Sequence, residues 1–248
     1  MKKVFAILLA LCMMLSLTAV AEDTQETLIM ATNATFPPYE SYENGEIVGV
    51  DVDIAAAIAK KLGMKLVVED MDFDAIIIAV STGKADIALA GMTVTEERLQ
   101  SVNFSTSYAT GIQSVIVREG SPITSVDDLT AEGAAYTVGV QEATTGDIYA
   151  CDDLGEDRVY KYKSGNDAVQ ALLTGKVDCV IIDNEPAKAY VAQNEGLVIL
   201  DTEYAVEDYA IAIALDNTEL LEKINAALEE LIADGTVAQI IANYISAD

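Results

Sequence analysis

Two segments of the chain, 92 positions apart, repeat one pattern of apolar and polar residues. In each, an apolar helical segment (residues 75–80 and 168–173) is followed by Thr-Gly-Lys, one further residue, an Asp and an apolar run. Gly83 and Gly175 suit the position after a helix, because glycine takes positive φ without a Cβ penalty. Each apolar run is hydrophobic on both faces, which predicts a buried parallel strand. We therefore expect a helix–turn–strand unit in each half.

Strand and helix patterns alternate along most of the chain. This order is typical of an α/β fold with mostly parallel sheets flanked by helices. A loop is expected at residues 32–39. Further strands are predicted at residues 28–31, 66–68, 111–117, 137–140, 159–161 and 209–215, and further helices at 54–62, 126–129, 185–194 and 218–244, the last interrupted near Asp234-Gly235.

These units do not divide at the middle of the chain. Residues 22–112 form one predicted lobe and residues 113–206 a second, in which the C-terminal helices have no natural place. We expect the chain to return through the run at 209–215, so that 207–248 completes the first lobe. Two adjacent connections would make a two-strand hinge, which lets the lobes close around a ligand.

The first 21 residues have the pattern of a secretory signal peptide. Lys2 and Lys3 precede an apolar stretch at residues 4–20, which ends in Ala19-Val20-Ala21. The stretch is shorter than the roughly 20 residues that span a membrane. Cys12 lacks the preceding small residue of a lipoprotein site. We expect cleavage after about Ala21, export to the periplasm or the extracellular space, and no lipid anchor.

The mature chain of 227 residues carries 12 basic and 41 acidic residues, a net charge of −29. Such a charge repels phosphate backbones and anionic membranes, so we expect no nucleic-acid partner. Cys151 and Cys179 remain after cleavage. Export permits a disulfide between them, but the apolar run around Cys179 favours a buried free thiol.

The residue inventory disfavours an enzyme. The chain has no His, which excludes Ser-His and Cys-His pairs and His-based zinc sites. No phosphate-binding glycine motif occurs at a strand-to-helix turn. With 41 acidic residues, a pair of acids carries little information about catalysis. We expect no cofactor and no metal.

Ligands of α/β sheets bind at the carboxyl ends of strands, and the segment after the first repeated strand carries suitable groups. It begins at Ala90. Gly91 permits close backbone approach, Thr93 offers a hydroxyl and Arg98 offers a planar guanidinium suited to a carboxylate. Equally compatible is a structural role, with Thr95 capping a short helix and Arg98 on its exposed face.

The second lobe offers two such segments. Asp183, at the end of the second repeated strand, could pair with an ammonium group or cap the following helix. Residues 140–146 run from a strand into a helix N-terminus, where Gln141, Thr144 and Thr145 could bind a carboxylate or form an ordinary cap.

The loop at residues 32–39 carries further candidates. Asn33 and Phe36 lie beside Pro37-Pro38, which stiffens the loop and could hold the aromatic ring as a wall of a cleft. For Tyr39, packing against the next element is the better interpretation.

Together these groups match a zwitterion. Arg98, the Thr93 hydroxyl and the Thr145 N–H would take an α-carboxylate, and Asp183 an α-ammonium. Charge-assisted hydrogen bonds are strong where water is excluded. Because the ligand would contact both lobes, it would favour the closed state.

The chain resembles the polar amino-acid-binding proteins of ABC importers (solute-binding protein family 3, similar to glutamine-, histidine- and lysine-arginine-binding proteins). The resemblance rests on A-T-N-A-T-F-P-P-Y-E (31–40), G-V-D-V-D (49–53), D-I-A-L-A-G-M-T-V-T-E-E-R-L-Q-S-V-N-F (86–104) and the run at 178–183. It implies a two-lobed Venus-flytrap fold that passes a free amino acid to a membrane permease. It also implies Arg98 at the α-carboxylate, Asp183 at the α-ammonium and Phe36 as the cleft aromatic.

Four positions depart from that family's pattern. Asn33 stands where several relatives have Asp, Val50 replaces an aromatic, Ala143 replaces a Gly and Ile78 replaces a Pro. These changes concern which ligand binds rather than its class. Neutral Asn33 and Gln141 favour an uncharged polar side chain such as glutamine.

Two other functions remain open. An exported enzyme on the same fold, similar to a cyclic-acid dehydratase, would need Glu142 or Asp183 as its acid or base. A detached sensor module would need a separate membrane partner. We expect a monomeric binding protein whose partners are a free polar amino acid and an ABC permease complex.

Overall fold

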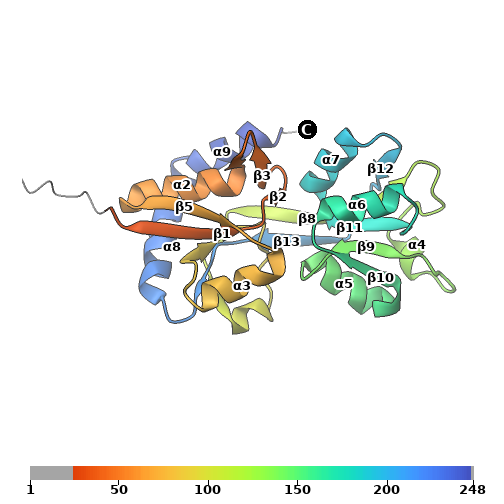
Figure 1. The fold of residues 1–248 in the computed structure, drawn as a ribbon, viewed down its shortest axis with the longest axis horizontal. Helices are drawn as coiled ribbons and strands as arrows, with labels where there is room; N and C mark the ends of the chain where they lie inside the picture. The colour runs from red at the N-terminus through yellow and green to blue at the C-terminus, as the bar shows by residue number, and fades with distance from the viewer. Residues whose placement is uncertain (1–24, 247–248) are drawn as a thin grey trace, which may run out of the picture.

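The computed structural model describes residues 25–246, and the chain forms two α/β lobes side by side (Figure 1). The predicted signal peptide, residues 1–21, lies outside the described residues. The first lobe contains a five-stranded sheet of β1 (Thr27–Thr32), β5 (Lys65–Asp70), β6 (Ile87–Ala88), β7 (Val102–Phe104) and β14 (Ala212–Ala214), in the order β5-β1-β6-β14-β7. It also holds α2 (Val50–Leu62), α3 (Phe73–Ser81), the 3₁₀ turn η1 (Arg98–Gln100), α8 (Thr218–Ala233) and α9 (Thr236–Tyr244).

The second lobe contains a six-stranded sheet. Its strands are β8 (Ala109–Arg118), β9 (Val138–Gln141), β10 (Val159–Tyr162), β11 (Cys179–Asp183), β12 (Leu197–Ile199) and β13 (Ala205–Tyr209), in the order β10-β9-β11-β8-β12 with β13 also paired to β8. The helical elements are α4 (Asp127–Thr130), α5 (Thr145–Leu154), the 3₁₀ turn η2 (Glu156–Arg158), α6 (Gly165–Leu173) and α7 (Asn184–Gln193).

The chain passes between the two lobes along β8 and β13. These strands pair antiparallel over five residues, from Ala109↔Tyr209 to Gln113↔Ala205, and Figure 1 shows both at the junction of the lobes. After β13 the chain adds β14 to the first sheet. The two-strand hinge expected from the sequence is therefore present in the fold.

The two repeated units end their helices in the same way. Thr82 and Thr174 are the C-caps of α3 and α6, and their hydroxyls donate to the carbonyls four residues earlier at 2.7 and 2.8 Å. Gly83 and Gly175 both have φ of 72°, as the sequence predicts. The turn therefore requires glycine at the same place in both units.

The acid that follows each turn fixes the start of the next strand. Asp86 accepts the backbone N–H of Ile29 at 2.8 Å, and Asp178 accepts that of Thr137 at 2.8 Å. Both following strands are buried, as expected, but each has one parallel and one antiparallel neighbour: β6 lies between β1 and β14, and β11 between β9 and β8. The antiparallel neighbours are β8 and β14. The chain enters these strands as it passes from one lobe to the other, and each lies within its sheet rather than at its edge.

Other expectations need local correction. Residues 32–39 are not wholly a loop, because β2 (Thr35–Phe36) pairs with β3 (Glu40–Glu43), which in turn pairs with β4 (Glu46–Val48). Helix α2 begins at Val50 rather than at residue 54. The run at 209–215 is divided between the end of β13 and β14. Such short pairings depend on tertiary contacts rather than on local periodicity.

Cys151 and Cys179 are both free, and Cys179 is buried in β11, so the free-thiol interpretation holds. Among residues 25–246, no helix combines the length and the apolar character needed to cross a membrane.

Candidate functional site

A pocket lies between the lobes. All ten ligand-binding residues predicted from the sequence line it: Asn33, Phe36, Ala90, Gly91, Thr93 and Arg98 from the first lobe, and Gln141, Thr144, Thr145 and Asp183 from the second. Two further lining residues, Glu40 and Phe73, were not predicted. The fold thus brings the strand-end segments of both lobes to one place.

Gly91 allows the backbone to lie against an aromatic wall of the pocket. Its φ is 51°, and a Cβ at this position would lie 2.8 Å from the Phe36 ring. Its N–H donates to the buried carboxylate of Asp51 at 2.8 Å. A side chain here would therefore strain the backbone and displace Phe36. This agrees with the expectation that Gly91 permits a close approach of the backbone.

Arg98 is buried, with 8% of its surface exposed, although it begins a short 3₁₀ turn. Its Nη1 donates to the carbonyl of Thr93 at 2.7 Å, and Nη2 donates to the carbonyl of Ala143, in the other lobe, at 3.1 Å. The guanidinium carbon lies 5.4 Å from the centre of the Phe73 ring. A guanidinium has five N–H donors, so the side chain can also donate to a ligand.

The structural interpretation of this segment is only half correct. Thr95 does cap the turn, since its hydroxyl oxygen accepts the N–H of Arg98 at 3.1 Å. The Arg98 side chain, however, is not on an exposed face. Burial lowers the pKa of Arg98, and the nearby carboxylates of Glu207 and Asp183 oppose that shift. The group keeps its positive charge because an arginine starts from so high a value.

Asp183 lies at the end of β11 and occupies the N-cap position of α7, but its carboxylate caps nothing. Instead Oδ2 accepts the amide of Gln113 at 2.6 Å, and Oδ1 accepts the hydroxyl of Tyr209. Burial raises the pKa of Asp183 to about 7. The capping interpretation is therefore wrong, because hydrogen bonds from β8 and β13 turn the carboxylate away from the helix.

The α5 segment contributes in two ways. Thr144 is an ordinary N-cap, whose hydroxyl oxygen accepts the N–H of Asp147 at 3.3 Å. Thr145, the next residue, is buried at the pocket. Gln141, at the end of β9, donates to the side-chain oxygen of Asn33 at 2.9 Å and so joins the two lobes.

Glu40 is the main pocket residue that the sequence reasoning missed. It is fully buried beside Asp51, and a protonated Glu40 can donate a hydrogen bond to the Asp51 carboxylate. Burial and the nearby Asp51 raise its pKa well above the usual value, and burial raises the pKa of Asp51 to about 6. Among 41 acidic residues nothing marks Glu40 in the sequence, because its burial depends on the β2-β3-β4 sheet.

Gln113 and Glu207 were also missed. They lie on β8 and β13, and both are buried. Gln113 stands in the mainly apolar run of β8, and a polar residue at such a position is a signal that could have found it. Nothing local distinguishes Glu207 from its neighbour Asp208 on β13.

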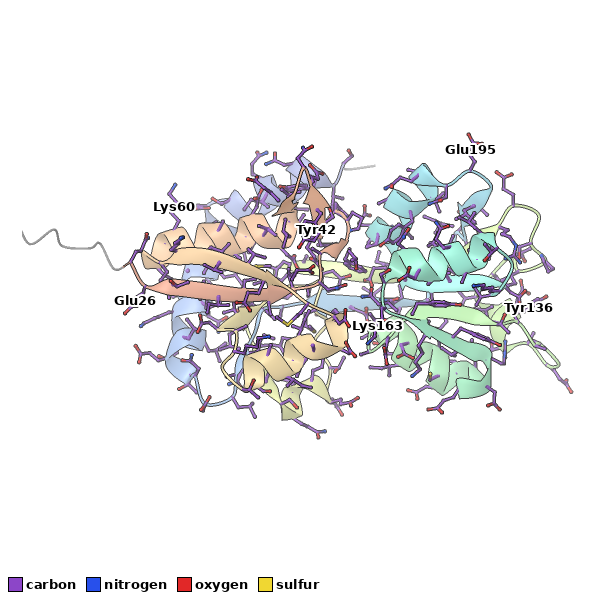
Figure 2. All side chains as sticks on the ribbon, viewed as in Figure 1. Glu26, Tyr42, Lys60, Tyr136, Lys163 and Glu195 are labelled. Atoms are coloured by element: carbon purple, nitrogen blue, oxygen red, sulfur yellow. The ribbon has the colours of Figure 1, made fainter. Side chains whose placement is uncertain are left out.

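An exposed ion-pair group joins the lobes at the surface (Figure 2). The ammonium of Lys163 lies 2.9 Å from Asp74 and 3.7 Å from Asp72, both in the first lobe, and 3.0 Å from Glu142 in its own lobe. Among residues 25–246, no cluster of three His, Cys, Asp or Glu side chains has the arrangement of a metal site.

The comparisons with known proteins point to one family. Residues 28–247 match the model of the bacterial extracellular solute-binding proteins, family 3. The chain is 34% identical to the arginine-binding extracellular protein ArtP of Bacillus subtilis, over 100% of both chains, and 34% identical to the putative ABC transporter arginine-binding protein 2 of Escherichia coli, over 95% and 96%.

Solved structures agree. An ancestral arginine-binding protein bound to glutamine superposes with a TM-score of 0.83 at 43% identity, covering 90% of this chain and 99% of that one. An ancestral arginine-binding protein bound to arginine gives a TM-score of 0.82 at 43% identity, with 90% of this chain and 100% of that one covered. With its two-lobed α/β fold and the pocket between its lobes, the chain belongs to the bacterial extracellular solute-binding proteins of family 3.

Proposed function

We propose that this chain is the substrate-binding component of an ABC amino-acid importer, which binds a free L-amino acid between its lobes and delivers it to a membrane permease. The observation that carries the proposal is that Arg98 and Asp183, from different lobes, line one buried pocket. A guanidinium suits an α-carboxylate, and a carboxylate suits an α-ammonium. Relatives named as arginine-binding proteins support this ligand class.

For the ligand side chain we propose a cationic group, with arginine first. Glu40 lines the pocket beside the buried Asp51, and a cation hydrogen-bonded to this pair of acids would favour their ionised form. Gln141 and Asn33 bond to each other, which leaves them less available for the glutamine side chain favoured by the sequence. Glutamine is the second candidate, since the ancestral relative binds both amino acids.

We further propose that residues 22–112 with 207–248 form the first lobe and residues 113–206 the second. The paired strands β8 and β13 support these limits. The proposal also includes cleavage of the chain after about Ala21 and a periplasmic or extracellular location without a lipid anchor. The mature protein would be a monomer that binds to an ABC permease.

An enzymatic role has less support. Glu142, the candidate acid or base, pairs with Lys163 at 3.0 Å and is not a lining residue of the pocket. The proposed activity therefore requires binding and release rather than turnover.

A thermal-shift screen of residues 22–248 against the 20 amino acids tests the proposal. We expect L-arginine to give the largest rise in Tm, and Arg98→Ala to abolish that rise. No response to any amino acid, together with conversion of a cyclic carboxylic acid, would overturn the proposal in favour of an enzyme.

A further inference from the structure

Glu207 is a buried carboxylate on β13, opposite Gly111 of β8. Its Oε2 atom accepts three hydrogen bonds, from the Thr145 hydroxyl at 3.0 Å, the Gln113 amide at 3.1 Å and the Thr93 hydroxyl at 3.2 Å. One oxygen atom therefore binds donors from the first lobe, from the second lobe and from a crossing strand.

Two of these donors belong to the pocket. Thr93 and Thr145 line it from opposite lobes, and both are buried. An ionised carboxylate only accepts hydrogen bonds, whereas a threonine hydroxyl has a single proton and two lone pairs. Because both protons are donated to Glu207, the hydroxyls retain only lone pairs for a ligand. The Gln113 amide lies 3.3 Å from the Thr145 oxygen and can take one of its two lone pairs, which leaves the other for the ligand.

This arrangement fixes which end of an amino acid each hydroxyl can bind. A lone pair accepts a hydrogen bond from an ammonium group and repels a carboxylate. We propose that Glu207 is a positioning residue of the site, which makes the Thr93 and Thr145 hydroxyls acceptors for the ligand's α-ammonium group. The inference rests on the proposed amino-acid function and reverses the sequence-based expectation that the Thr93 hydroxyl holds the α-carboxylate.

Gln113 extends the same effect to Asp183. Its amide nitrogen donates to Glu207 at 3.1 Å and to Asp183 at 2.6 Å. Glu207 thus holds the donor that orients the proposed ammonium-binding carboxylate. The α-carboxylate of the ligand is left to Arg98 and to backbone N–H groups.

The test compares two ligands on the mature chain, residues 22–248, by isothermal titration. L-arginine has the α-ammonium, and 5-guanidinopentanoate is the same molecule without it. The variant Glu207→Gln keeps the side-chain shape but can donate through its amide, which frees the threonine protons to turn toward the pocket. We expect the Kd for L-arginine to rise at least tenfold and the Kd for 5-guanidinopentanoate to change less than threefold.

A matched control lies one residue along the same strand. Asp208→Asn removes an equal charge from an exposed position and should leave both Kd values unchanged. An equal loss for both ligands in Glu207→Gln, or no loss for either, overturns the inference. Wild-type protein that binds no amino acid instead overturns the proposed function, so the two failures are distinguishable.

A second pair of variants applies if Glu207→Gln does not fold. Thr93→Val removes the hydroxyl, and Thr93→Ser keeps it. The inference expects Thr93→Val to weaken L-arginine and not 5-guanidinopentanoate, with Thr93→Ser close to wild type. If Thr93→Val weakens both ligands equally, the hydroxyl serves the carboxylate and the inference is wrong.

Discussion

The unit of α3 and β6 and the unit of α6 and β11 are built alike until their strands end. Each has a threonine C-cap, a glycine at φ of 72° and an aspartate that accepts a backbone N–H at 2.8 Å. Beyond the strands they differ. The first leads through Gly91 to the buried cation Arg98, and the second ends in the buried anion Asp183.

The comparison shows that each unit contains one set of residues that stabilises the fold and another set that faces the pocket. Residues at the helix-to-strand turn satisfy backbone groups, so both lobes use the same types. Residues past the strand face the pocket, where the lobes need opposite charges to match the two ends of a zwitterion. The predictions below alter one unit or the other, beginning with the largest effect.

Removing the charged group of either unit should abolish binding. We expect Arg98→Ala and Asp183→Asn each to weaken the affinity for L-arginine by about 3 kcal/mol or more, since each leaves a ligand charge unpaired. The variants should differ in stability without ligand. Asp183→Asn should stabilise the protein at pH 8 by roughly 1 kcal/mol, because the wild type buries an ionised acid there. Calorimetric titration and urea unfolding measure the two effects, and a loss of affinity of less than about tenfold in either variant would contradict the first.

Of the two charged groups that follow the repeated strands, only Asp183 should make binding depend on pH. Burial raises the pKa of Asp183 to about 7, while Arg98 stays charged. Because the α-ammonium pairs with the ionised form, affinity should fall about tenfold per pH unit below 7. Asp183 should affect the stability of the unliganded protein in the opposite direction, since its folded state binds the extra proton. The stability that this group contributes is full below about pH 4 and is lost as the pH rises toward 7. Calorimetric titrations from pH 5 to 8 test the affinity of the wild type. Urea unfolding over the same range tests the stability, whose dependence on pH should be weaker in Asp183→Asn.

The two turn aspartates should affect stability and spare affinity. Asp86→Ala and Asp178→Ala each leave a backbone N–H without its acceptor, at a cost of about 1–2 kcal/mol. Asp178 also accepts the Thr137 hydroxyl at 2.9 Å, so its loss should be the larger. Urea unfolding gives the free energies, and a loss of ligand affinity without a loss of stability would contradict the separation of roles.

The exposed ion pairs of Lys163 test whether contacts between the lobes assist closure. Lys163→Met removes pairs to Asp72 and Asp74 in the other lobe, whereas Glu142→Gln removes a pair within the same lobe. We expect Lys163→Met to speed ligand dissociation about threefold at low salt, since exposed pairs contribute about 0.2–1 kcal/mol. Glu142→Gln should have no such effect. Stopped-flow dissociation shows whether the two variants differ.

The α5 turn carries a small strain that its counterpart lacks. Ala143 has φ of 64°, whereas the αL residues of the two repeated turns are glycines. Ala143→Gly should stabilise the protein by a few tenths of a kcal/mol, because glycine adopts this conformation without the Cβ penalty. The gain is small because glycine also increases the entropy of the unfolded chain. Thermal unfolding measures it, and a fall in Tm would show that the entropy term dominates.

Much of this architecture could be predicted from local pattern. The glycine turns, the order of strands and helices and the ten pocket residues all follow from which residues end each strand, because the carboxyl ends of strands in an α/β lobe face the ligand. The roles of Thr95, Arg98 and Asp183 could not be separated in this way. The same residue types cap helices and bind ligands, and only the burial of the side chain distinguishes the two roles.

The sequence by itself determined the repeated units, the strongly negative net charge and the kinds of group at each strand end, since these depend on composition or on residues near one another in the chain. Only the tertiary structure decided that Glu40 is buried beside Asp51 at the pocket and that Glu207 joins Thr93 to Thr145. Those contacts connect residues more than 60 positions apart or depend on a sheet of very short strands. Their environment is set by how the two lobes meet, and no local pattern records it.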